Sequence, residues 1–96
     1  MKKPDDQPKH ILVVEDHKEI ALVVEKRLSK IFTVEVAENG EVASEKLLAN
    51  EYDLVILDLS LPKKSGFEVL KELRKRSAFP PVLILSGLNA VDDKVK

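Results

Sequence analysis

The feature of this sequence that most constrains its fold is a regular alternation between two kinds of apolar periodicity. Four short runs contain β-branched residues and are typical of strands; they span 10–14, 33–36, 54–57 and 82–85. Between them, apolar residues recur every three or four positions, which is the spacing of a helix that buries one face. These helical segments span 18–31, 41–49 and the residues after Ser65, and another begins near residue 89.

The order of these segments predicts an α/β fold. Strands that alternate with helices form a parallel sheet through right-handed crossovers, with helices on both faces. For a chain of 96 residues we expect the doubly wound, flavodoxin-like strand order 2-1-3-4. In this order the chain reverses direction between the first and third strands. Ligands of such folds bind outside the carboxyl ends of the strands at that switch point.

Length and composition exclude several other classes of protein. The size predicts one domain, and we expect a polar N-terminal tail over residues 1–9 and the folded domain over 10–96. The formal net charge of −1 provides no basic surface for nucleic acid or for an anionic membrane. The absence of cysteine excludes thiolate metal sites, and no apolar run is long enough to span a bilayer. The N-terminus lacks the apolar stretch of a signal peptide, so we expect a cytoplasmic protein.

Acidic residues follow the two strands that flank the switch point. Glu15 and Asp16 come directly after the first strand, and Asp58 comes directly after the third. If these strands are neighbours, three carboxylates meet in one crevice, and their mutual repulsion favours a bound cation. All three donors are hard oxygens, so the cation we expect is Mg²⁺. A carboxylate beside Mg²⁺ suits phosphoryl transfer, in which it can act as the nucleophile and form an aspartyl phosphate.

Individual residues of this region also have simpler explanations. Acidic residues after a strand are often solvated or cap the next helix, and Asp16 could do no more than that. The three carboxylates together are better explained as one site. His17 lacks the spacing of a metal-binding histidine and is predicted to be structural or solvated. Asn39-Gly40 and Gly66 are predicted to serve turn geometry only.

Three segments carry a resemblance to a known family. They are ILVVEDH (11–17), YDLVILDLSLPKKSG (52–66) and PPVLILSG (80–87). Their residue types and their spacing are similar to those of the receiver domain of response regulators in two-component signalling, over nearly the whole chain. The resemblance implies that Asp58 accepts a phosphoryl group and that Glu15 and Asp16 help to hold Mg²⁺.

The resemblance also assigns roles to three smaller residues. It implies that Ser60 offers its backbone carbonyl to the metal, that Ser86 hydrogen-bonds the phosphoryl group, and that Gly87 lets a backbone N–H approach a phosphate oxygen. Ser86 could equally cap the helix that follows it. The implied function is a phospho-accepting signalling switch that receives its phosphoryl group from a histidine kinase or a phosphotransfer protein. Such a domain catalyses its own phosphorylation and dephosphorylation, and we do not expect an enzyme that turns over an external substrate.

The resemblance stops short of the family's C-terminal elements. The sequence matches neither the fifth strand of a receiver domain, with its lysine, nor the fifth helix. We therefore expect a C-terminally incomplete receiver whose fourth strand, 82–85, is an exposed edge that favours a homodimer or strand exchange. The alternative is a pseudo-receiver or truncated fragment that acts as an assembly module without phosphorylation. A phosphatase of the aspartyl-nucleophile class is disfavoured, because Ser60 stands where that class has a second acid.

Overall fold

A computed structural model describes residues 9–61, 63–77 and 80–85 of the chain. Ser86 and Gly87, to which the sequence assigns phosphoryl contacts, lie outside the described residues, as does the helix expected from residue 89. Within these ranges, no helix is both long enough and apolar enough to cross a membrane.

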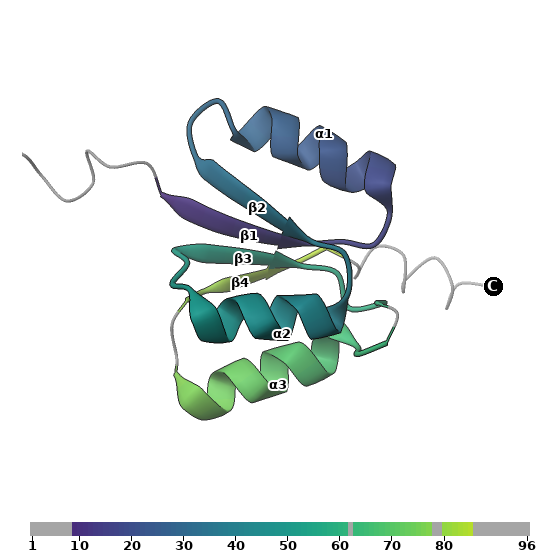
Figure 1. Ribbon diagram of the computed structural model, residues 1–96, viewed down its shortest axis with the longest axis vertical. Coiled ribbons are helices and arrows are strands. Elements are labelled where there is room, and N and C mark those ends of the chain that lie inside the picture. Colours follow the sequence, from purple (N-terminus) through teal and green to yellow (C-terminus); the bar gives the residue numbers. More distant parts are fainter. Residues whose placement is uncertain (1–8, 62, 78–79, 86–96) are drawn as a thin grey trace, which may run out of the picture.

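The described residues form a four-stranded parallel sheet (Figure 1). Its strands are β1 (His10–Val14), β2 (Thr33–Ala37), β3 (Leu54–Leu57) and β4 (Val82–Ile84). The strand order is β2-β1-β3-β4, which confirms the flavodoxin-like order predicted from the sequence. β1 and β3 are therefore neighbours, and the switch point lies between them.

Helices cover both faces of the sheet. They are α1 (Lys18–Leu28), α2 (Gly40–Ala49) and α3 (Gly66–Arg76). Helix α1 lies on one face, and α2 and α3 lie side by side on the other (Figure 1). Alternate residues of β1 serve the two faces: Leu12 packs in the core beneath α2 and α3, whereas Val13 packs on the side of α1. A strand buried on both faces is what the apolar run of β1 predicts.

The boundaries of most elements agree with the sequence pattern, but the first helix is shorter than predicted. It ends at Leu28, and the N–H groups of Ile31 and Phe32 both donate to the Leu28 carbonyl in the turn that follows. Ile31, which continued the helical periodicity, is consequently 69% exposed, and Phe32 is partly buried in its place. The predicted capping box of the third helix is confirmed, since Ser65 and Glu68 exchange side-chain and backbone hydrogen bonds.

A polar cluster ties the amino ends of three strands together. The Glu35 carboxylate of β2 accepts hydrogen bonds from Tyr52 Oη at 3.0 Å, from His10 Nε2 at 2.8 Å and from Lys46 Nζ at 3.3 Å. Burial raises the pKa of Glu35, but the hydrogen bonds from its three donors together lower it by more. The net pKa of Glu35 is therefore below its usual range. Burial and the bond to Glu35 raise the pKa of Tyr52 to about 12. The cluster links β1, β2, α2 and the residues before β3.

Replacement of Glu35 by glutamine is expected to make the unfolding free energy less dependent on pH in the acidic range. The carboxyl pKa of Glu35 is lower in the folded than in the unfolded chain, so this group stabilises the fold above about pH 4.3 and loses that effect as the pH falls through its folded value. Glu35→Gln should lower the unfolding free energy near pH 7, because it weakens the charged hydrogen bonds of this cluster. The loss should be only about 1 kcal/mol, because the side chain is one-third exposed. The difference from the native protein should shrink at about pH 3.5.

Urea unfolding at the two pH values measures this difference. Glu45→Gln, on the exposed surface of the same helix as Lys46, is the matched control and should change neither value. A deficit of Glu35→Gln that persists or grows in acid would contradict the assignment.

Candidate functional site

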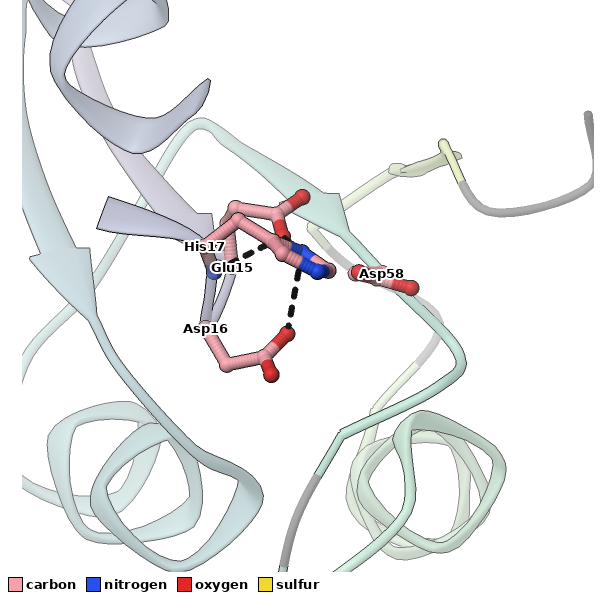
Figure 2. Close-up of side chains that lie close together, drawn as sticks. All are labelled: Glu15, Asp16, His17 and Asp58. Atoms are coloured by element: carbon pink, nitrogen blue, oxygen red, sulfur yellow. Dashed lines mark hydrogen bonds and ion pairs between the residues drawn. The ribbon is translucent and has the colours of Figure 1, made fainter. Parts of the chain in front are cut away.

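The carboxyl ends of β1 and β3 bring acidic residues together. β1 and β3 pair in parallel up to Val14 and Leu57, so the residues that follow, Glu15 and Asp58, leave the sheet at the same edge. The pairing extends one step beyond the strands, because the Asp58 N–H donates to the Val14 carbonyl at 3.0 Å. The predicted convergence of Glu15, Asp16 and Asp58 is therefore present in the fold (Figure 2).

Two of the three carboxylates are almost completely removed from solvent. Glu15 is 4% exposed and Asp58 is 2% exposed, whereas the side chain of Asp16 is partly open. Asp58 Oδ1 accepts a hydrogen bond from the Ser60 backbone N–H at 2.9 Å, which fixes the orientation of the carboxylate. Buried like charges at such short range raise the free energy of the fully ionised site, and a cation relieves that cost.

His17 is the fourth member of this cluster. Its Nδ1 lies 2.7 Å from Glu15 Oε2 and 3.5 Å from Asp16 Oδ1, and its backbone N–H also donates to Glu15 Oε2, at 3.1 Å (Figure 2). The hydrogen bond with Glu15 raises the pKa of His17 most, and the charges of Asp16, Glu15 and Asp58 add to it while burial opposes them. The sequence predicted a structural or solvated role. The only signal for this placement was that His17 follows the acidic pair directly.

The donor set fits a divalent cation. Glu15, Asp16, His17 and Asp58 each present a ligand atom, and these atoms all lie within 4.8 Å of one another. Asp16 Oδ1 is buried and has no hydrogen-bond partner among the described residues, which is costly unless another group compensates it. Three carboxylates with an unsatisfied buried oxygen match the preference of Mg²⁺ for hard oxygen ligands.

Glycine at the start of α3 lets the helix approach the loop that follows Asp58. A Cβ at Gly66 would overlap the Asp58 carbonyl oxygen and would lie 2.6 Å from Leu59 Cα. A Cβ at Gly40, at the start of α2, would overlap the Lys64 carbonyl in the same way. The expectation that these glycines serve turn geometry only is wrong, because a side chain at either position would overlap a neighbouring backbone, and neither has a positive φ. Close approach of two backbones is the requirement instead.

The smaller predicted site residues have different outcomes. Ser60 is exposed, and its backbone N–H contacts Asp58, so it lies beside the cluster as predicted. The role of its carbonyl toward a metal stays a prediction. Asp16 does not cap α1, whose N-cap residue is His17.

Comparison with known proteins identifies the family. The family model described as the response regulator receiver domain matches residues 11–96. The cell cycle response regulator CtrA of Brucella ovis is 40% identical over 87 residues, which make up 90% of this chain and 38% of that protein. This chain thus spans well under half the length of these curated relatives.

Solved structures agree with this relationship. The receiver domain of Francisella response regulator 1452 matches with a TM-score of 0.79 and 32% identity over 91% of this chain and 73% of the other. TrrA of Thermotoga maritima, solved in complex with Mg²⁺ and BeF, gives a TM-score of 0.70 and 31% identity over 91% and 96% of the two chains. TrrA in its complex with the histidine kinase ThkA gives a TM-score of 0.75 and 39% identity over 82% of this chain and 69% of the other. The chain belongs to the response-regulator receiver family.

Substitution of Gly66 by alanine should disturb both stability and the position of Asp58. The added methyl group meets backbone rather than a flexible side chain, so α3 or the 58–59 segment must move. We expect a loss of about 1–3 kcal/mol in unfolding free energy. Phe67→Ala, one residue further along the same helix, removes an exposed side chain and should change stability by no more than about 0.5 kcal/mol. Equal stability of the two variants in urea unfolding would show that this close approach is not required.

Proposed function

We propose that this chain is a phospho-accepting switch in which Asp58 is the acceptor. Membership of the receiver family supports a role in two-component signalling. The observation that carries the assignment to Asp58 is the buried carboxylate at the end of β3, oriented by the Ser60 N–H and facing the acidic pair from β1. Of the three carboxylates, Asp58 follows β3, whereas Glu15 and Asp16 follow β1, the other interior strand at the switch point.

The proposed reaction is a phosphoryl transfer between two side chains. An oxygen of the Asp58 carboxylate attacks the phosphorus of a phosphohistidine on the donor protein. A P–O bond forms, the P–N bond breaks, and the donor nitrogen keeps the electron pair of the broken bond. Water later attacks the aspartyl phosphate, which restores Asp58 and releases inorganic phosphate. The domain catalyses its own modification and turns over no external metabolite.

The surrounding residues act by position and charge. Glu15, Asp16, Asp58 and the Ser60 carbonyl would hold Mg²⁺, which when bound supplies positive charge to the phosphoryl oxygens. His17 restrains Glu15 through a side-chain and a backbone contact to the same oxygen. Ser86 and Gly87 would contact the phosphoryl group according to the family resemblance.

The proposed donor is a histidine kinase or a phosphotransfer protein. The likeness to TrrA, which forms a complex with the histidine kinase ThkA, supports a kinase as partner for this chain. A cytoplasmic location is part of the same proposal and rests on the sequence.

Phosphorylation of the protein by a small acyl phosphate tests the role of Asp58. In the presence of Mg²⁺ we expect an acid-stable, base-labile increase in mass that disappears in Asp58→Asn and on removal of Mg²⁺ with a chelator. Asp53→Asn is the matched control, because Asp53 lies at the amino end of the same strand and contacts His10 instead. It should leave the adduct unchanged. An adduct that survives in Asp58→Asn would exclude Asp58 as the acceptor, and a native protein without adduct would favour the assembly-module alternative.

We also propose that β4 pairs with a second copy of the chain. Within the described residues, β4 contacts β3 on one side only, and Leu83 is 53% exposed. Leu83 borders a largely apolar groove of about 510 Å³ that Phe32 and Leu54 also line. An exposed apolar edge strand favours pairing with another chain.

Sedimentation velocity tests this pairing. The native protein should sediment as a dimer or larger species, and Leu83→Lys should shift it toward monomer, because a charge at an edge strand opposes pairing. Leu48→Lys on the exposed surface of α2 is the control and should leave the distribution unchanged. A sharp monomer that unfolds cooperatively in the native protein would refute the proposal.

A further inference from the structure

His17 lies in the site, but Mg²⁺-dependent phosphoryl transfer does not require an imidazole ligand. Mg²⁺ prefers oxygen and keeps several waters, so the three carboxylates satisfy it without an imidazole. His17 nevertheless lies within the same cluster, with its ligand atom no more than 4.8 Å from those of Glu15, Asp16 and Asp58. The ring is 60% exposed, so it is open to an incoming ion.

The distances around Nδ1 match those within a metal coordination shell. Nδ1 lies 2.7 Å from Glu15 Oε2 and 3.5 Å from Asp16 Oδ1. Two ligands that each lie about 2.1 Å from a metal are about 3.0 Å apart in an octahedral site and about 3.4 Å apart in a tetrahedral one. The Nδ1–Oε2 contact is about 0.3 Å shorter than the octahedral value, and movement of the exposed His17 ring would lengthen it to that value.

The chemistry of the donors defines the class of ion. Imidazole together with carboxylate suits Zn²⁺ and other late first-row divalent cations, which bind nitrogen more strongly than Mg²⁺ does. No cysteine is present to compete for such an ion. The second histidine of the chain, His10, is committed to Glu35 near the amino ends of the strands. Asp16 Oδ1, buried and without a hydrogen-bond partner, supplies an oxygen ligand at the same point.

We infer that His17 is a metal-specificity residue, which gives the acidic site an imidazole ligand and lets it hold a late first-row divalent cation, such as Zn²⁺, in place of Mg²⁺. The inference rests on the proposed function only in using the same carboxylates. Its consequence is that the two classes of cation share one site and displace each other, whereas only the late cation contacts His17.

Nuclear magnetic resonance of the histidine-labelled protein tests this directly. At about pH 8, where an ordinary histidine is neutral, one equivalent of Zn²⁺ should shift the ring signals of His17 and leave those of His10 in place. Mg²⁺ should leave the His10 ring unchanged and should shift the His17 signals less than Zn²⁺ does, because it alters only the carboxylates that face the ring. Zinc shifts on His10 alone, or on neither ring, would overturn the inference.

Calorimetric titration of variants separates ligation from a structural role. His17→Ala removes both a Zn²⁺ ligand and a contact that orients Glu15, so it should weaken Zn²⁺ binding at least about tenfold more than it weakens Mg²⁺ binding. His17→Gln can still donate a hydrogen bond to Glu15, so it preserves a merely structural role; it should lose Zn²⁺ affinity like alanine. His10→Gln is the matched control and should bind Zn²⁺ as the native protein does. Full Zn²⁺ affinity in His17→Gln would refute ligation by the imidazole.

The acyl phosphate assay keeps this inference distinct from the proposed function. If the native protein forms no Asp58 adduct or does not bind Mg²⁺, the proposed function is contradicted. The zinc measurements would still show whether His17 is a ligand. Normal phosphorylation with zinc binding that does not depend on His17 would contradict the inference alone.

Discussion

The parallel pairing of β1 with β3 is the interaction on which the rest of this structure depends. It sets two apolar strands side by side in register and makes both of them end at the same edge of the sheet. The bond from the Asp58 N–H to the Val14 carbonyl continues that register into the site. A slip of the register would move every side chain of a strand to the other face, and the burial of Leu12 and Leu57 opposes it. The same packing that forms the core therefore fixes the distance between the carboxylates.

Burial beside this core raises the free energy of the ionised carboxylates in the site. Glu15 and Asp58 are nearly inaccessible to water, and ionised carboxylates lose much of their solvation in such a place. The apolar side chains directly before them stabilise the strands that carry them, so the fold tolerates this cost. A cation, or an imidazole such as that of His17, lowers the energy of the cluster. Sensitivity to bound charge is thus a direct consequence of ending two buried strands with acids.

The sequence predicted those parts of the molecule that depend on local pattern. Apolar periodicity gave the strands and helices, and their alternation gave the strand order and the convergence of Glu15, Asp16 and Asp58. Features that arise from tertiary contact were not accessible in this way. Ile31 fits a helical pattern, but the chain turns at Leu28, and Gly66 reads as a turn residue until the backbone of Asp58 is placed against it. His17 belongs to the cluster because of the direction in which its ring points, which no spacing rule contains.

The two polar clusters of the sheet show how structural and functional carboxylates differ. Glu35 has three donors from three elements, so its charge is compensated within the fold and its pKa is lowered. Asp16 Oδ1, at the carboxyl ends of the strands, is buried and has no hydrogen-bond partner among the described residues, whereas the Glu35 side chain is one-third exposed. At the Glu35 cluster, the chain provides three hydrogen-bond donors for one carboxylate. The incomplete satisfaction of Asp16 among the described residues is consistent with the proposed cation site at the carboxyl ends of the strands.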